Sequence, residues 1–431
     1  MNLTSNPLSW PFLPLSAQSE EERARWWADC YCAGLAETVG ELTGWRVVTG
    51  SNGSGKSVLL AALERRERGE ALIIGYPPER WAGTPQCWVP KGNHFAQMMA
   101  GAAWQLREYI LTHEEKAKGL SEVHFEFMRW LVEKYLGERA FRSWAGGLSP
   151  ELAAKFPPDP TDDFFPTTTQ LLDVQGQIDE LVSVARRLGH PRILLFSDVD
   201  SSTAQNQVYT IENLFSQVEV IQHPGFSVLV ALPVESLATA RVVERARGRL
   251  SVTFMSWEAK ELWDLATLYL KMALGVSDEF LPSVQSSLET TLLEVYGEYI
   301  PIAWISLVET IVFLVKGGRI SWPVQEKDLS VLTREFFIRH IPIKIDLQKH
   351  GIWRGRHFIP LQGQPLAFLE VLHRNPGKSF HLSHAHLSSV AQTKNNLHSL
   401  ASRTRKRIEP FPDDPIYLQH DEDGYRLEHL E

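Results

Sequence analysis

With 431 residues the chain is too long for one compact core, so two or three domains are expected. Because 44% of the residues are hydrophobic and 22% charged, as in ordinary globular proteins, long disordered segments are not expected. Its formal net charge of −9 argues against a protein coated in nucleic acid, although a local basic face is compatible with that charge. No run of about 18 apolar residues predicts a membrane span, and three cysteines make no disulfide framework, which favours the cytoplasm.

The first part of the chain has the pattern of a parallel α/β sheet. Residues 19–22, Ser-Glu-Glu-Glu, form a capping box that predicts a helix. A strand at 45–48, a Gly-rich turn, a helix at 56–68 and a second strand at 71–75 follow. A strand–turn–helix–strand order of this kind opens an α/β parallel sheet.

Residues 80–165 interrupt that order. They carry long amphipathic patterns at 95–111 and 121–136 and end in a Pro/Asp-rich stretch, so we expect a helical insertion. The sheet pattern then resumes with a helix at 171–188 and strands at 193–196, 226–232 and 250–254. From 257 to about 337 the pattern is wholly helical, and a compact terminal module follows.

Residues 50–57, Gly-Ser-Asn-Gly-Ser-Gly-Lys-Ser, fit the phosphate-loop pattern Gly-x-x-x-x-Gly-Lys-Ser between a strand and a helix. Glycines allow a tight turn whose N–H groups point at phosphate oxygens, and the helix start adds its positive dipole end. The expected nucleotide-binding residues are Gly50, Asn52, Gly53, Ser54, Gly55, Lys56 and Ser57. Lys56 would reach the β- and γ-phosphates and Ser57 would hold Mg²⁺. A Gly-rich turn that binds no nucleotide is the alternative.

A Mg²⁺-bound triphosphate also needs an acidic group at the end of a neighbouring strand. Asp198 follows the apolar strand at 193–196, and we expect it to bind Mg²⁺ or polarise water, with Asp200 as its helper. The alternative is that both acids merely end a strand. ATP is expected rather than GTP, because the chain has no Asn-Lys-x-Asp motif for reading guanine.

This sheet domain followed by a helical lid resembles the AAA+ and STAND branch of P-loop ATPases, whereas residues 171–190 lack the Ser-Gly-Gly signature of ABC-type and SMC-type ATPases. The resemblance implies that the arginine-rich segment 241–249 presents an arginine to a neighbouring subunit's nucleotide; a solvated helix face is the alternative. Residues 296–304 resemble the Gly-x-Pro-Arg segment of these lids, with Ile302 in place of the arginine. Ser197 stands where many relatives have the first of two acids.

These two departures bear on hydrolysis. One well-aimed arginine contributes about 10³-fold or more to the rate of phosphoryl transfer. We therefore expect ATP binding with weak or conditional hydrolysis rather than fast turnover.

The terminal module has a helical pattern at 361–372 ended by Asn-Pro-Gly, a basic run at 402–410, and a strand at 424–427. In order and spacing these pieces resemble the winged-helix effector domain of OmpR/PhoB-type response regulators over roughly 355–430. The resemblance implies that the helix containing 395–407 lies in the DNA major groove and that its basic side chains contact phosphates of the DNA backbone. The DNA-binding residues it implies are Lys394, Asn395, Asn396, His398, Arg403, Arg405, Lys406 and Arg407.

The wing of this module departs from that family. Residues 420–423 read His-Asp-Glu-Asp where relatives place a basic residue, and three acids would be repelled by a phosphate backbone. The spacing of Cys30, Cys32, Cys87 and His94 matches no common zinc site, so buried free thiols are expected. His381, His384 and His386 lie on one short turn and lack a natural fourth ligand, so solvated histidines are expected.

The expected architecture is an α/β P-loop NTPase parallel-sheet core (1–255) with a helical insertion, an all-α lid (256–345) and a C-terminal winged helix (350–431). The first hypothesis is an ATP-binding switch that couples nucleotide state to double-stranded DNA binding, in transcription, a mobile element or a defence system, with or without homo-oligomer formation. The second is a signalling or scaffold ATPase whose winged helix binds a protein partner. A motor enzyme with strong turnover is disfavoured by the missing signature and lid arginine.

Overall fold

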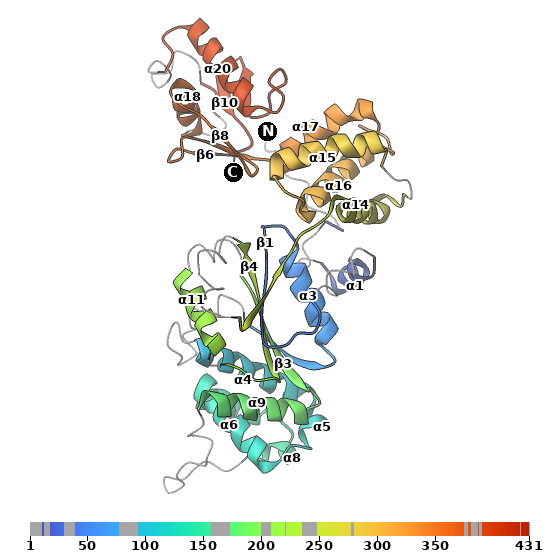
Figure 1. Ribbon diagram of the computed structural model, residues 1–431, viewed down its shortest axis with the longest axis vertical. Coiled ribbons are helices and arrows are strands. Elements are labelled where there is room, and N and C mark those ends of the chain that lie inside the picture. The colour runs from blue at the N-terminus through green and yellow to red at the C-terminus, as the bar shows by residue number, and fades with distance from the viewer. Residues whose placement is uncertain are drawn as a thin grey trace. The chain divides into compact units, whose positions relative to one another are not determined.

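The computed structural model describes residues 11–12, 18–29, 39–76, 94–156, 173–199, 208–219, 221–234, 248–276, 280–374, 378–380, 387, 390–422 and 424–430. They fall into two compact units, each described by itself (Figure 1). The sheet unit lies within residues 33–256. The helical unit combines residues up to 32 with residues 257–431.

The sheet unit is built on five parallel strands in the order β2-β3-β4-β1-β5. The strands are β1 (Trp45–Gly50), β2 (Ala71–Gly75), β3 (Arg192–Asp198), β4 (Phe226–Pro233) and β5 (Leu250–Phe254). The three central strands β3, β4 and β1 are buried along nearly their whole length, as expected where helices cover both faces, whereas the edge strand β5 is partly exposed. The predicted α/β parallel sheet is confirmed.

Helices cover the two faces differently. The helix α3 (Lys56–Glu67) packs on one face, against β3 and β4. The opposite face packs against α9 (Val174–Arg187), α11 (Val208–Ser216) and α4 (His94–Thr112) in one hydrophobic core. Figure 1 shows α3 and α11 on opposite sides of the sheet.

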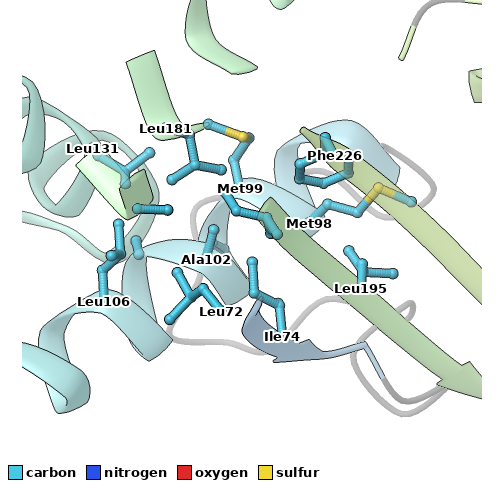
Figure 2. Close-up of a cluster of buried hydrophobic side chains, with 14 of the residues drawn as sticks. Leu72, Ile74, Met98, Met99, Ala102, Leu106, Leu131, Leu181, Leu195 and Phe226 are labelled. Atoms are coloured by element: carbon cyan, nitrogen blue, oxygen red, sulfur yellow. The ribbon is translucent and has the colours of Figure 1, made fainter. Parts of the chain in front are cut away.

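The predicted helical insertion is confirmed, and it contributes to this core. After α4 it continues with α5 (Glu114–Ala117), α6 (Glu122–Leu136), α7 (Glu138–Ala145) and α8 (Pro150–Ala153). Met98, Ala102 and Leu106 recur every four residues on one side of α4, and they meet Leu72 and Ile74 of β2 in the core (Figure 2). The Pro/Asp-rich stretch at 157–166 lies outside the described residues.

The segment expected to form the lid is helical in the described ranges, as predicted, and the name lid is kept here for its helices. Its helices are α14 (Ala259–Leu274), α15 (Pro282–Tyr296), α16 (Pro301–Lys316) and α17 (Leu329–His340). Prolines occupy the first positions of α15 and α16, where a missing N–H costs nothing, and Trp304 is fully buried among the helices. The helix α1 (Glu20–Asp29) joins this unit through Trp26, whose indole N–H donates to the Tyr269 hydroxyl at 2.9 Å. No helix in the described ranges is long and apolar enough to cross a membrane.

The C-terminal module, residues 343–430, starts with an antiparallel three-stranded sheet of β6 (Ile343–Asp346), β7 (Gly351–Arg354) and β8 (His357–Pro360). The helices α18 (Gln364–His373) and α20 (Lys394–Ile408) follow, and then the antiparallel hairpin of β9 (Leu418–Asp421) and β10 (Gly424–Leu427). The first strand begins at Ile343, inside the range expected for the lid. Strands of four residues are too short to show a clear alternation in the sequence.

The lid contains one histidine whose environment makes folding sensitive to acid. The Nε2 atom of His340 lies 3.1 Å from the Thr310 hydroxyl, and burial, with a smaller contribution from Arg339, lowers the pKa of His340 to about 4. The unfolded chain has a histidine pKa near 6.5. Between these two values the unfolded state binds a proton that the folded state does not, so stability falls as pH falls.

We therefore expect His340→Asn to reduce the acid sensitivity of folding. From about pH 7.5 to about pH 5, the wild type should lose about 2 kcal/mol more unfolding free energy than the variant, because each pKa unit corresponds to about 1.4 kcal/mol. Urea unfolding of the full chain at both pH values, followed by tryptophan fluorescence, measures the difference. An equal loss in both proteins would show that His340 titrates in the folded state as in the unfolded chain.

Candidate functional site

The loop between β1 and α3 is shaped by three glycines, each needed for a physical reason. Gly53 and Gly55 have φ angles of 81° and 95°, in the left-handed region that glycine adopts without strain. Gly50 is needed for space, because a Cβ atom there would lie 2.7 Å from the Ser54 Oγ atom. The chain therefore turns back tightly at the carboxyl end of β1.

Lys56 places a positive charge across this loop. Its ammonium group donates to the main-chain oxygens of Gly50 and Ser51, at 2.9 Å each, and the residue is only 9% exposed. Gly55, the N-cap residue of α3, has no side chain that could satisfy the first N–H groups of the helix. An ammonium group beside such a helix start favours an anion such as phosphate. Asn52 and Ser57 are exposed at the same loop.

The strand register places Asp198 on the same side of the sheet as α3. Asp198 pairs with Ala231 of β4, and Ala231 pairs with Val48 of β1. Paired residues of parallel strands point to the same face, and the alternate residues Val47 and Val230 belong to the core on the other face. Asp198 therefore faces the side that α3 covers, and its side chain is exposed. Hydroxyl and carboxylate oxygens such as those of Ser57 and Asp198 suit Mg²⁺.

Ser197 differs from Asp198 in both burial and direction. It is 1% exposed and pairs with Val230, so it points into the opposite face of the sheet. Asp200 lies outside the described residues, as do residues 241–247 of the arginine-rich segment. Arg249, which is described, is exposed directly before β5, at the edge of the sheet opposite the phosphate loop. Ile302, at the place of the lid arginine, is 46% exposed on the first turn of α16.

In the described ranges, no three histidine, cysteine, aspartate or glutamate residues lie together as metal ligands. Of the two groups considered for metal binding, the structure describes only His94. The Nδ1 atom of His94 is 2.7 Å from the Tyr76 hydroxyl in the core. The remaining residues of both groups, Cys30, Cys32, Cys87, His381, His384 and His386, lie outside the described residues, and so do residues 375–377.

The helix α20 has one face in the module and one in solvent. The Thr393 hydroxyl accepts a hydrogen bond from the Asn396 N–H at 3.2 Å and caps the helix. Six of the eight residues named for DNA contact are exposed: Lys394, Asn395, Asn396, Arg403, Lys406 and Arg407. Leu397, Leu400 and Ile408 are buried on the other face.

The other two residues named for DNA contact lie against the β9–β10 hairpin. The Nδ1 atom of His398 is 2.6 Å from the Tyr425 hydroxyl. Arg405 donates to the main-chain oxygen of Leu418 at 2.9 Å, and its guanidinium lies over the Tyr425 ring. Both contacts hold the hairpin on α20.

The hairpin carries fewer uncompensated acids than its sequence indicates. His420 and Asp421 belong to β9 and not to the connecting turn. The Asp421 carboxylate accepts a hydrogen bond from the Ser379 hydroxyl at 3.0 Å and pairs with Arg426. Glu422 is exposed in the turn, and Asp423 lies outside the described residues.

The cations at the end of α20 differ in their surroundings from seven other arginines of the helical unit. Arginines with a carboxylate within ion-pair distance are Arg319, Arg334, Arg339, Arg354, Arg356, Arg374 and Arg426. Within the part of the chain that the structure describes, Arg403, Lys406 and Arg407 have no such partner. Together with Gln362, Gln364 and Pro365 they line an open pocket of about 490 Å³. The two glutamines carry no sequence signal, because their place depends on how α18 packs on α20.

The sheet, the loop and the lid together give the chain an α/β P-loop NTPase fold. No family model matches the sequence, and no curated protein matches it. Among solved structures, the Aeropyrum pernix Orc1 protein in complex with DNA is 14% identical, with 73% of this chain and 65% of that chain covered and a TM-score of 0.34. This chain therefore spans about two thirds of the Orc1 chain.

Two further solved structures are similar to this chain. The Thermotoga maritima RuvB Holliday junction branch migration motor is 12% identical, with 96% and 95% of the two chains covered and a TM-score of 0.32. A Walker-type ATPase of Pyrococcus abyssi is 12% identical, with 91% and 92% covered and a TM-score of 0.32. TM-scores of this size identify no shared function, so the function has to be inferred from the geometry of the chain.

The packing of the loop yields a direct test. In Gly50→Ala, the new Cβ would lie 2.7 Å from the Ser54 Oγ atom and 3.2 Å from the Met255 Cβ atom, so Ser54 and its neighbours must shift. We expect this shift to lower ATP affinity about tenfold or more. Gly69→Ala is the matched control, because a Cβ there meets nothing within 4 Å. Titration of a fluorescent ATP analogue measures both variants. Wild-type affinity in Gly50→Ala, or an equal loss in Gly69→Ala, would contradict a phosphate site at this loop.

Proposed function

We propose that the protein is an ATP-binding switch, with weak or conditional ATPase activity, that couples its nucleotide state to double-stranded DNA binding through the C-terminal module. The observation that carries the nucleotide part is the Lys56 ammonium group, held across a glycine-shaped loop at the start of α3. Asp198 on the same side of the sheet supports a Mg²⁺-dependent site.

The roles in this site follow from the positions of the residues. The loop N–H groups from Asn52 to Lys56 bind the phosphates, with Gly50, Gly53, Ser54 and Gly55 giving the loop its shape. Ser57 and Asp198 hold Mg²⁺, and Asp200 assists Asp198. Ser197 points away from this side, and an isoleucine replaces the lid arginine, which supports slow hydrolysis. Arg249, if it meets a second copy of the chain, would face that copy's nucleotide.

The DNA part of the proposal is supported by α20. Its N-terminal half exposes Lys394, Asn395 and Asn396, whose charged and amide groups suit phosphates and base edges. We assign the module to the winged-helix type of the OmpR/PhoB effector domains, with α20 as the helix that enters the major groove. His398 and Arg405 then position the hairpin instead of contacting DNA.

The lid and the module are joined closely enough to transmit a change. The β7–β8 turn packs on the end of α15, where Arg356 N–H donates to the Val295 oxygen at 3.1 Å and the Arg356 side chain pairs with Glu298. Arg354 pairs with Glu294 at 3.2 Å. Glu294 and Val295 directly precede the lid segment 296–304, and Glu298 lies within it. The AAA+ resemblance implies that this segment contacts the nucleotide. A lid shift driven by ATP would therefore move the module.

A second candidate function is a signalling or scaffold ATPase whose C-terminal module binds a protein. The exposed Glu422 in the hairpin turn and the net charge of −9 favour it. DNA binding separates the two candidates.

We expect duplex DNA binding to require ATP–Mg²⁺, to weaken as salt rises, and to disappear in Lys56→Ala. The double variant Lys394→Ala/Asn395→Ala should bind more weakly, with the slope of log affinity against log salt reduced by about 1, because one phosphate contact is lost. Lys378→Ala removes an exposed charge of the same module and is the control.

Fluorescence anisotropy with labelled duplexes at several salt concentrations measures these effects. Equal DNA affinity with and without ATP would show that the nucleotide site does not control DNA binding. A wild type that binds ATP but no DNA in any condition would favour the protein-binding candidate.

A further inference from the structure

The three-stranded sheet of β6, β7 and β8 has one buried face and one outer face. On the buried face, Ile352 and Ile359 pair across β7 and β8, and both are at most 9% exposed. Successive side chains of a strand point to opposite faces, so Trp353 and Phe358, which also pair, belong to the outer face. Both aromatic residues are partly exposed, and Lys344, which pairs with Trp353 from β6, is exposed. The outer face therefore presents two neighbouring aromatic rings beside a cation.

The two rings are held in place by the sheet. Their centroids lie 5.0 Å apart, and their planes are inclined at 52°. The Phe358 ring lies over Gly351, where a Cβ atom would come within 2.5 Å of the Phe358 Cζ atom. The indole N–H of Trp353 donates to the Asp346 carboxylate at 3.2 Å. A flat partner that stacks on these rings would lose little affinity to the ordering of side chains.

The segment that forms this sheet, residues 343–360, is basic although the whole chain carries a net charge of −9. Its one acid is Asp346, which also accepts the main-chain N–H of Lys349 at 3.0 Å. Two of its basic residues are the arginines already described at the joint with the lid. The other two are exposed: Lys344 lies opposite Trp353 in the strand register, and the Lys349 ammonium group lies 5.0 Å from the centroid of the Trp353 ring.

We propose that the outer face of this sheet binds single-stranded DNA, with bases stacked on Trp353 and Phe358 and phosphates beside Lys344 and Lys349. Aromatic side chains flanked by cations bind unpaired nucleotides with little sequence preference, because every base has a π-face to stack. In a duplex those faces are covered by the neighbouring base pairs, so this surface suits an unpaired strand. A protein partner could also cover the rings, but it would not need the lysines on both sides of Trp353.

The choice of DNA rather than RNA rests on the proposed function, in which α20 of the same module binds duplex DNA. The two surfaces have different chemistry, since α20 exposes charged and amide groups whereas the sheet exposes aromatic rings. A module with both surfaces would bind most tightly to a duplex that carries a single-stranded overhang. The inference thus adds a second class of DNA substrate to the proposed function.

The test measures binding of a short labelled oligo-dT by the full chain, with fluorescence anisotropy at several salt concentrations. Trp353→Leu and Phe358→Leu keep an apolar side chain but remove the ring, and each should weaken binding about tenfold. Phe358→Tyr keeps a ring and should bind like the wild type. Lys349→Gln should reduce the slope of log affinity against log salt by about 0.7, because one phosphate contact is lost.

Trp104→Leu is the matched control. Trp104 lies on the insertion helix α4, is 40% exposed, and has the Arg107 guanidinium 5.0 Å from its ring centroid. It therefore offers the same aromatic and cationic chemistry outside the sheet, and its loss should leave oligo-dT binding unchanged. Thermal unfolding checks that every variant folds.

The outcomes separate this inference from the proposed function. A wild type that binds duplex but no oligo-dT would overturn the inference and leave the proposed function standing. Wild-type binding of oligo-dT in both Trp353→Leu and Phe358→Leu, or an equal loss in Trp104→Leu, would also overturn it. Ring-dependent oligo-dT binding by a protein that binds no duplex would support the inference and overturn the proposed duplex switch. Tighter binding of oligo-U than of oligo-dU would assign the face to RNA and overturn the proposal.

Discussion

The structure depends on the tight turn between β1 and α3. The place of β1 in the sheet fixes where this turn occurs, and a Cβ atom at Gly50 would lie only 2.7 Å from the Ser54 Oγ atom and 3.2 Å from the Met255 Cβ atom. This turn lets the Lys56 ammonium group donate hydrogen bonds to the main-chain oxygens of Gly50 and Ser51, where β1 ends. A buried ammonium group beside the start of a helix favours a bound anion, which is why this loop is the centre of the proposed function.

Within the helical unit, the lid helices and the C-terminal module are joined by several close contacts. Gly355, with a φ angle of 60°, lets the β7–β8 turn approach α15 so closely that a Cβ would lie 2.8 Å from Val295. The buried Tyr417 hydroxyl donates to the Ile341 oxygen at 2.7 Å, on the segment that joins lid and module. Hydrogen bonds and ion pairs at several points make independent movement of the lid helices and the module costly. The proposed switch relies on this coupling, because a difference in ATP affinity between two lid states would then also move the module.

Local patterns predicted much of this fold, because they depend on neighbours in the chain. The loop at 50–57, the apolar strands and the amphipathic helices of the insertion all appear where the periodicity indicates. Contacts between distant segments were not predictable. The sheet order depends on pairing between β1 and β4, almost two hundred residues apart, and the turning of His398 and Arg405 toward the hairpin depends on Tyr425 and Leu418. Helical spacing in the sequence shows that one face of a helix is polar, but it does not show which of the polar residues contact another element.

The most direct test of the account is calorimetric titration of the full chain with ATP, with Mg²⁺ and with EDTA, in the wild type and in Lys56→Ala. The account predicts one saturable site in the wild type that weakens without Mg²⁺, and loss of binding in Lys56→Ala while its thermal unfolding without nucleotide stays close to that of the wild type. A wild type that binds no ATP, or a Lys56→Ala variant that binds it equally well, would contradict the central claim.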